Sequence, residues 1–309
     1  MHDIKSIRKQ PEFFAKKLKS RNIEADLNIL LNLDKKYREL IQEKEKLEQE
    51  KKIISKKQDE SLFAKSKEMS KKIEELEKSE LKIKKEINLI LSSLPNIALD
   101  EVPVGKDEKS NKEIKKIGEI TKLDFKPLSH YEIGEKLNLM DFDIASKTSG
   151  ARFVFLKSKL ALLERAISNF MLDVHTKKFA YQEISPPLIV NENTMYGTGQ
   201  LPKFEKDQFE INSEEEKLRK FLIPTAEVPL SNMTRETILD VAELPKRYVS
   251  HTPCFRSEAG AAGKDTRGIM RQHQFYKVEL VSLTSEDQSN DEHERMLSCA
   301  EEVLKRFDL

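Results

Sequence analysis

The sequence predicts an α+β protein in which a helical arm precedes a domain of mixed strands and helices. Two observations carry this prediction. From residue 27 to residue 94, apolar residues recur every three or four positions among lysines and glutamates, which is the spacing of a coiled coil. From Thr252 to Val281, two strand patterns flank a basic, glycine-rich loop. A chain of 309 residues has room for about two such domains.

The composition limits the classes of function. Charged residues make up 35% of the chain and hydrophobic residues 38%, while the net charge is only +1. Nucleic-acid binding must therefore come from local patches, because no global field favours it. The two cysteines, Cys254 and Cys299, provide no disulfide framework and fit a reducing compartment. Because no apolar run approaches the roughly 20 residues of a membrane span, we expect a cytoplasmic protein without a membrane partner.

The N-terminal third predicts one short and two long helices. The short amphipathic helix covers Ile4–Ser20, and the long helices are separated by a break at Gln58–Ser66 and ended by Pro95. Because no domain lies between the long helices, they should fold back as an antiparallel coiled-coil hairpin about 45 Å long. The residues expected to face inward are Ile7, Phe14 and Leu18 in the short helix, Leu30, Leu33, Tyr37, Leu40, Lys44, Leu47, Lys51 and Ile54 in the first long helix, and Met69, Ile73, Leu76, Glu80, Ile83, Ile87, Ile90 and Leu94 in the second.

Two uses of this arm stay open from its residues alone. One is a dimerisation rod or spacer, which is the commoner role of a helical hairpin. The other is an RNA grip, in which lysine-rich faces hold the phosphate backbone by charge. The charge pattern does not decide between them, because acidic residues are nearly as common as basic ones.

The middle of the chain predicts a linker followed by helices and strands. Leu94–Asn111 is rich in proline, glycine and charge, as linkers are. A helix signal after His130 precedes a strand at Arg152–Leu156, and Lys159–Lys178 carries apolar residues on one side, as a core helix does. Tyr181–Val190 then predicts a strand, which its two prolines place at an edge or an interface.

An apolar strand is predicted at Leu222–Val228, and it ends in a Thr-x-Glu sequence at Thr225 and Glu227. Nothing in these residues is intrinsically catalytic. A threonine followed by a glutamate at a strand end more often caps a helix than binds a ligand.

The segment from Thr252 to Val281 holds the residues best suited to chemistry. Arg256 is a planar, permanently charged partner for phosphate or carboxylate, and Phe275 offers a face on which a base can stack. The loop between the strands is not a P-loop, because Gly260-x-x-Gly263-Lys264 is followed by Asp265 and not by serine or threonine. From the residues alone, a surface ion pair and a solvated hairpin stay the commoner interpretations.

The segment Phe255–Gln274 resembles motif 2 of class II aminoacyl-tRNA synthetases, and specifically that of bacterial-type seryl-tRNA synthetases. Lys159–Lys178 and the strand after it resemble motif 1, which builds the dimer interface of that class, although Ala180 stands where the motif usually has glycine. The hairpin resembles the arm that holds the long variable arm of the tRNA. The resemblance implies a tRNA-binding domain over residues 1–110, with the arm at about 27–94, and a class II antiparallel-sheet catalytic domain over residues 111–309.

The resemblance also implies the reaction and its site. It implies a homodimeric serine–tRNA ligase that uses ATP with Mg²⁺, activates L-serine and charges tRNA-Ser and also tRNA-Sec, with no dedicated metal site in the chain. Arg256 would be the catalytic residue, bridging the serine carboxylate and the α-phosphate. Glu258 would accept from the adenine amino group, Phe275 would stack on adenine, and Arg271 would reach the outer phosphates. The implied serine-binding residues are Thr225, Ala226, Glu227, Arg256 and Glu279, and the implied ATP-binding residues are Arg256, Ser257, Glu258, Arg271, Gln272 and Phe275.

The family's motif 3, with its second phosphate-binding arginine, has no counterpart before Leu309. We therefore expect the sequence to represent about three quarters of a family member, and to fold poorly or be inactive on its own. Two other functions stay open. One is a catalytically dead remnant that binds RNA or dimerises. The other is an amino acid:carrier-protein ligase, against which the long arm argues.

Overall fold

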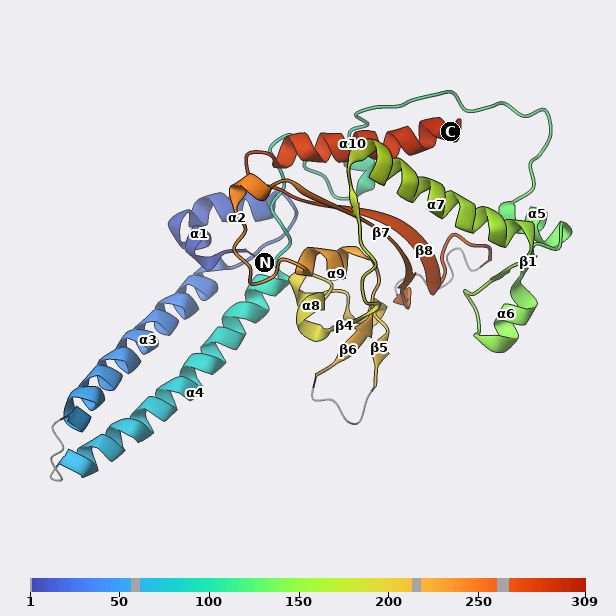
Figure 1. Cartoon of the computed structure of the whole chain (residues 1–309). Helices are drawn as coiled ribbons and strands as arrows, with labels where there is room; N and C mark the ends of the chain where they lie inside the picture. The colour runs from blue at the N-terminus through green and yellow to red at the C-terminus, as the bar shows by residue number, and fades with distance from the viewer. Residues whose placement is uncertain (1, 57–61, 213–217, 260–266) are drawn as a thin grey trace. The chain divides into compact units, whose positions relative to one another are not determined.

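The computed structural model describes residues 2–56, 62–212, 218–259 and 267–309 (Figure 1). The chain divides into two compact units, Met1–Lys116 and Ile117–Leu309. Gly260, Gly263 and Lys264 of the basic loop lie outside the described residues, as does the first part of the predicted helix break. No helix in the described ranges is long and apolar enough to cross a membrane.

The first unit begins with two helices where one was predicted, α1 (Ile4–Lys9) and α2 (Pro11–Lys19). The helix ends before Pro11 because proline lacks the N–H that an α-helix needs in its interior, whereas it fits the first turn of a new helix. The inward positions are as predicted. Ile7, Phe14 and Leu18 are buried and share one core with residues of the two long helices.

The predicted hairpin is confirmed: α3 (Leu27–Lys56) and α4 (Phe63–Ser93) lie side by side (Figure 1). The predicted break extends too far, because α4 already begins at Phe63 and its first turn consists of residues that tolerate a helix. Lys44 and Glu80, which both occupy predicted seam positions, form an ion pair across the hairpin at 2.5 Å. A charged pair therefore takes the place of an apolar layer in the seam.

The second unit contains a sheet with the order β3-β7-β8. β7 (Lys246–Phe255) and β8 (Gln274–Leu283) pair antiparallel along their full length, and β3 (Gln182–Glu183) joins β7 in parallel. Another sheet has the order β4-β6-β5, with β4 (Ile189–Asn191), β5 (Glu210–Ile211) and β6 (Lys220–Leu222).

Three strand predictions need correction. The strand predicted at Leu222–Val228 ends at Leu222 as part of β6, because Pro224 cannot donate a backbone hydrogen bond, and Glu227 already begins α9 (Glu227–Asn232). The strand predicted at Tyr181–Val190 is divided between β3 and β4, which belong to different sheets. The two prolines between them interrupt the ladder, because proline cannot donate a backbone hydrogen bond. The strand predicted at Arg152–Leu156 contracts to β2 (Phe155–Leu156), since Arg152 has a φ of 61° and leaves the extended region.

Short elements connect these parts of the second unit, and two of them, α5 (His130–Lys136) and η3 (Glu205–Asp207), contact the ends of the loop between β7 and β8. The others are β1 (Met140–Asp141), α6 (Phe142–Thr148), α8 (Glu192–Gly197) and η4 (Val241–Glu243), while η2 (Glu108–Ser110) belongs to the first unit.

Helices cover the two faces of the β7–β8 ladder (Figure 1). On one face, α7 (Lys159–Phe179) and α10 (Ser289–Arg306) pack around a core that contains Val249 and Cys299. On the other face, the turn before α9 (Glu227–Asn232) packs on Tyr248 and Val281. The helix predicted at Lys159–Lys178 is thus confirmed, and the site lies on the face next to α9.

Candidate active site

Strand alternation brings Phe275 and Glu279 to the same face of β8, since side chains two residues apart point the same way. Their partners in β7 are Cys254 and Ser250, both buried. Thr225 reaches this face from the turn between β6 and α9, and its hydroxyl donates a short hydrogen bond to Glu279 Oε2. Residues 54 positions apart in the sequence therefore meet at one polar cluster.

The same cluster contains Lys277, for which neither the residue pattern nor the family resemblance predicts a role. Its Nζ lies 2.8 Å from Thr225 Oγ1 and 2.8 Å from Glu279 Oε2. The sequence did hold a signal for it, because Lys277 stands between Phe275 and Glu279 in the period-two pattern and must share their face.

Glu227 is the first residue of α9, and the residue as a whole is exposed although protein atoms surround part of its carboxyl group. Loss of hydration raises the pKa of Glu227, the charge of Glu279 raises it further, and Lys277 opposes both. Thr225 does not act as a helix cap, because the N-cap of α9 is Ala226 and no side chain caps it. Ala226 is fully buried against Tyr248 and Val281, so its side chain belongs to the core.

Arg256 follows the last residue of β7, and its guanidinium lies over the ring of Phe275 at 5.4 Å. A backbone bond of 3.0 Å from Arg256 to the carbonyl of His273 continues the ladder beyond the strands, and the His273 ring contacts the Arg256 carbonyl at 2.9 Å. These bonds fix the backbone of Arg256 while its side chain stays on the same face as Glu279.

Glu258 and Arg271, predicted to bind different parts of ATP, form an ion pair with each other at 3.0 Å. Glu258 has a φ of 51°, a left-handed conformation that is uncommon outside glycine and turns the chain away from the strand direction. Ser257 does not present its hydroxyl to this site, because that group donates to the carbonyl of Lys206. The Ala259 amide bonds Asp207 Oδ1 at 3.0 Å, so η3 supports the base of the loop.

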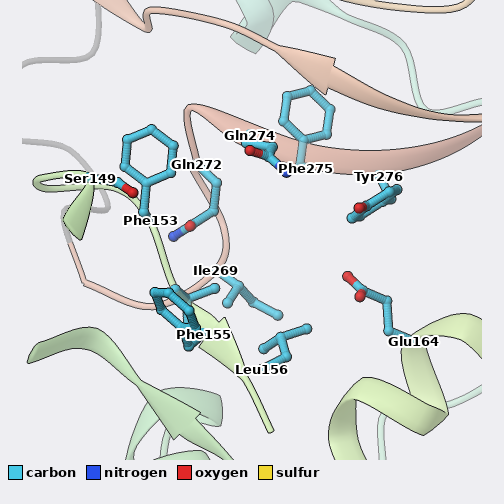
Figure 2. Close-up of a pocket in the computed structure, with 11 residues that line it drawn as sticks. Ser149, Phe153, Phe155, Leu156, Glu164, Ile269, Gln272, Gln274, Phe275 and Tyr276 are labelled. Atoms are coloured by element: carbon cyan, nitrogen blue, oxygen red, sulfur yellow. The ribbon is translucent and has the colours of Figure 1, made fainter. Parts of the chain in front are cut away.

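Gln272 lines a cavity that it shares with Phe275 but not with Arg256, Ser257, Glu258 or Arg271. Gln272 is buried, its amide donates to the Gly268 carbonyl at 2.6 Å, and the cavity, of about 430 Å³, lies between β8 and the segment before α7. Figure 2 shows Glu164 of α7 pointing into this cavity toward Tyr276. The cavity is lined by Ser149, Phe153, Val154, Phe155, Leu156, Glu164, Ile269, Gln272, Gln274, Phe275 and Tyr276.

The C-terminal base of the loop contacts α5, a contact that no sequence pattern predicts. The Ile269 amide donates to His130 Nε2 at 2.9 Å. Arg267 lies over the ring of Tyr131 at 5.4 Å and within 3.5 Å of Glu135. Such contacts join residues more than 130 positions apart, and no local pattern encodes them.

Side chains that bind metal ions do not cluster in the described part of the chain. Within residues 2–56, 62–212, 218–259 and 267–309, no three His, Cys, Asp or Glu side chains gather closely enough to hold an ion. The residues of the cluster therefore receive no role as ligands of Mg²⁺.

Comparison with known proteins gives two family matches. Residues 1–98 match the family described as Seryl-tRNA synthetase N-terminal domain, and residues 208–309 match the family described as tRNA synthetase class II core domain (G, H, P, S and T). The chain is 56% identical to the serine–tRNA ligase of Pelagibacter ubique over 309 residues, which are 100% of this chain and 74% of that protein. It is 48% identical to the serine–tRNA ligase of Parvibaculum lavamentivorans, with the same two shares.

Solved structures are similar over nearly the whole chain. The seryl-tRNA synthetase of Pyrococcus horikoshii, complexed with ATP, superposes with a TM-score of 0.83 at 36% identity, covering 99% of this chain and 74% of that one. The cytoplasmic serine–tRNA ligase of Naegleria fowleri, in complex with AMP, gives a TM-score of 0.78 at 29% identity, covering 94% of this chain and 68% of that one.

Proposed function

The chain belongs to the seryl-tRNA synthetase family, and we propose that its class II core performs the serine–tRNA ligase reaction with the residues gathered on β7, β8 and the turn before α9. The observation that carries the proposal is the shared face of β8. It presents an aromatic ring, Phe275, under the guanidinium of Arg256, and a carboxylate, Glu279, four residues further along the strand.

The first step joins two anions. An oxygen of the serine carboxylate attacks the α-phosphorus of ATP, the bond from that phosphorus to the bridging oxygen breaks, and pyrophosphate leaves with the bonding electrons. In the second step, a hydroxyl of the terminal adenosine of tRNA-Ser attacks the seryl carbonyl, the bond from the carbonyl carbon to the phosphate oxygen breaks, and AMP leaves with the bonding electrons while the hydroxyl proton passes to the departing phosphate. No protein nucleophile takes part in either step, so the work of the protein is positioning and charge stabilisation.

Arg256 suits the first step because its planar guanidinium can bond a carboxylate and a phosphate together. As the charge on the α-phosphate grows, this cation stabilises it more strongly than in the ground state. Phe275 would hold the adenine by stacking, which requires the guanidinium to share or leave the ring that it now covers.

The Glu258–Arg271 pair suits an ATP site that is closed by its own side chains before ATP arrives. ATP would replace the pair: the adenine amino group would donate to Glu258, and Arg271 would turn to the outer phosphates. Ser257 and Gln272 would support the site through the backbone contacts that they make at the two ends of the loop.

Glu279 and Glu227 would receive the ammonium and the hydroxyl of L-serine, with Thr225 beside them. A buried polar site built for a hydroxyl rejects analogues without one, because its own groups would lose their partners. Alanine is thereby excluded, whereas threonine must be excluded by size.

Further parts of the proposal rest on the family alone. They are Mg²⁺ bound with the ATP phosphates, tRNA-Sec as a second acceptor, a homodimer through α7 and the strand after it, and a cytoplasmic location. The assignment of tRNA binding to residues 1–110 and of catalysis to residues 111–309 rests on the family in the same way.

ATP–pyrophosphate exchange with the purified chain, one amino acid at a time, tests the proposal. Exchange that depends on serine, with threonine and alanine inactive, is the expected result. Exchange with a different amino acid would contradict it. Binding of L-serine should be measured in parallel. Binding without exchange would support the amino-acid site but show that this chain alone does not catalyse the first step.

A further inference from the structure

Lys277 contacts two of the proposed serine-binding residues, yet the reaction described above leaves it without a role. Its ammonium is 2.8 Å from Thr225 Oγ1 and 2.8 Å from Glu279 Oε2, and Thr225 donates to the same Oε2. In the described part of the chain, no hydrogen bond reaches the other oxygen of Glu279. The cluster therefore occupies one side of this carboxylate and leaves the other for a ligand.

The chemistry of the donors sets the direction of these hydrogen bonds. An ammonium group only donates, and a hydroxyl carries a single proton. Thr225 Oγ1 must therefore accept from Lys277 and give its own proton to Glu279. Lys277 thereby fixes the rotation of the Thr225 hydroxyl, which has no proton left for a ligand.

The charges of the cluster are unequal in number. Two carboxylates, Glu227 and Glu279, stand beside one ammonium, that of Lys277. Cys254 of β7 faces the same cluster, but burial raises the pKa of its thiol, so it stays neutral. Arg256 lies near Cys254, toward the Phe275 end of the face, and the proposed function commits it to the serine carboxylate and the α-phosphate. One negative charge is left over, which matches one ligand ammonium.

We propose that Lys277 is a positioning residue of the amino-acid site, which cancels one carboxylate charge and orients the Thr225 hydroxyl, so that the pocket accepts a ligand with one ammonium group and rejects a ligand with two. This inference rests on the proposed function, because it takes serine as the ligand. It also explains why Glu279 can be preorganised without a bound substrate: Lys277 already holds one of its oxygens in place.

The electrostatic half of the inference is tested without any ligand. The carboxyl of Glu227 is titrated by ¹³C NMR in the unchanged chain and in Lys277→Met and Lys277→Arg, with Glu227→Gln for assignment. The pKa of Glu227 should rise in Lys277→Met, because the opposing cation is lost, and stay near its starting value in Lys277→Arg. An unchanged titration in a folded Lys277→Met variant would overturn the inference.

The predicted ligand preference is tested with L-serine and L-2,3-diaminopropionate, which carries an amino group in place of the serine hydroxyl. Binding is measured by calorimetry at a pH low enough to protonate both amino groups. The unchanged chain should prefer serine, and Lys277→Met should move the ratio of the two dissociation constants about tenfold toward diaminopropionate. A purely structural role would weaken both ligands equally and leave the ratio unchanged, and Lys277→Arg should keep the original preference.

The two proposals fail in different ways. If the unchanged chain binds ATP but neither amino acid, the proposed serine site is wrong and the inference about its ligand falls with it, whatever the titration of Glu227 shows. If the unchanged chain binds serine and Lys277→Met leaves the ratio unaltered, only the role of Lys277 is wrong. Should Lys277→Met not fold, Lys277→Gln, which keeps most of the side-chain volume without the charge, takes its place.

Discussion

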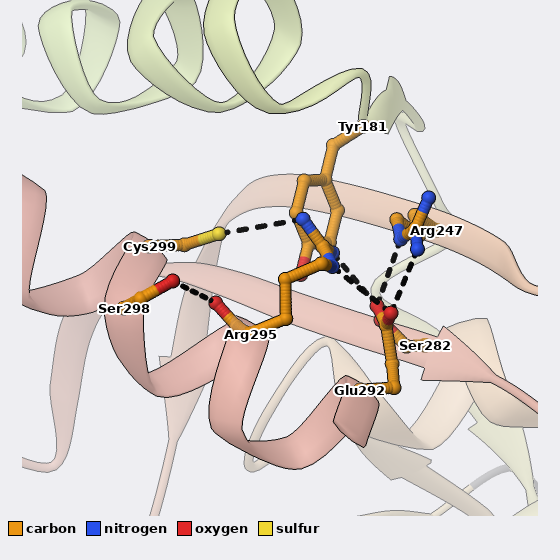
Figure 3. Close-up of polar contacts among 7 residues, drawn as sticks. All are labelled: Tyr181, Arg247, Ser282, Glu292, Arg295, Ser298 and Cys299. Carbon is orange, nitrogen blue, oxygen red and sulfur yellow. Dashed lines mark hydrogen bonds and ion pairs between the residues drawn. The ribbon is translucent and has the colours of Figure 1, made fainter. Parts of the chain in front are cut away.

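Arg247 holds Glu292 in a two-pronged ion pair that fastens α10 to the start of β7, with Nε–Oε1 at 2.8 Å and Nη2–Oε2 at 2.7 Å (Figure 3). Arg295 and Ser282 bond the same carboxylate at 2.7 and 2.8 Å. Glu292 is only 6% exposed. Burial alone would raise its pKa, but the hydrogen bonds from the arginines and the serine outweigh burial and hold the pKa far below the ordinary value.

Glu292→Gln should lower the free energy of unfolding by about 3 kcal/mol at neutral pH, because two arginines lose their buried partner. The pKa in the folded state is depressed, so the stabilisation is present above the unfolded value of about 4.5 and is lost as the pH falls below it. Urea unfolding at several pH values should therefore show a steeper acid loss in the unchanged chain than in the variant. Glu294→Gln, at an exposed position of the same helix, is the control, and an equal effect of both variants would contradict the account.

Lys44 and Glu80 should stabilise the arm although they stand in an apolar seam. Their side chains are only 20% and 21% exposed, so Lys44→Glu should cost about 1 kcal/mol of unfolding free energy. The charge swap of both residues should restore part of that loss, as measured by thermal melting of the helices. Lys72 and Glu43 pair on the surface of the same hairpin, with side chains 57% and 50% exposed. Their swap should change little, and a similar loss there would show that burial of the pair does not matter.

Gly268→Ala should disturb the base of the loop in two ways. The residue has a φ of 93°, which disfavours any side chain, and an added Cβ would overlap the ring of His130. Gly199, with a φ of 71°, has open space around the same position, so Gly199→Ala reports backbone strain alone, about 1 kcal/mol. Gly268→Ala should lower the melting temperature more than Gly199→Ala, and adding His130→Ala should recover part of the difference. Equal effects of the two glycine variants would mean that contact with α5 is unimportant.

Substitutions of Glu279 and of Glu258 should each affect a different substrate of the first step. Glu279→Gln should raise the KM for serine about a hundredfold, because a carboxylate paired with the ammonium is lost, and should change the KM for ATP little. Glu258→Gln should do the reverse. The pair of KM values from ATP–pyrophosphate exchange checks this, or the two dissociation constants if exchange is absent. A serine effect of the same size in both variants would contradict the assignment.

Much of the fold follows from local patterns. The hairpin, α7, α10 and the β7–β8 ladder are all encoded by apolar periodicity, which survives in the structure because each element buries the face that the period defines. The same periodicity brings Phe275 and Glu279 together. It also predicts that Lys277, which stands between them in the sequence, lies on the same face of the strand.

Other parts depend on contacts that no local pattern records. The hydroxyl of Ser257 donates a hydrogen bond to a carbonyl 51 positions away in the sequence. The side-chain amide of Gln272 donates to the Gly268 carbonyl within a tight turn. The motif predicts that such residues belong to the site, but not whether their side chains are free. Pro11 is different: its signal was present in the sequence, and the continuous amphipathic pattern around it concealed the break.

A structure of the chain with a non-hydrolysable analogue of seryl-adenylate tests the central claim most directly. The account predicts the analogue on the α9 side of β8, with its ammonium bonded to Glu279, its adenine on Phe275 and the Arg256 guanidinium between the seryl and phosphate groups. An analogue that makes no contact with Glu279 or Arg256, for example one bound beside Glu164 in the cavity that Gln272 lines, would contradict it.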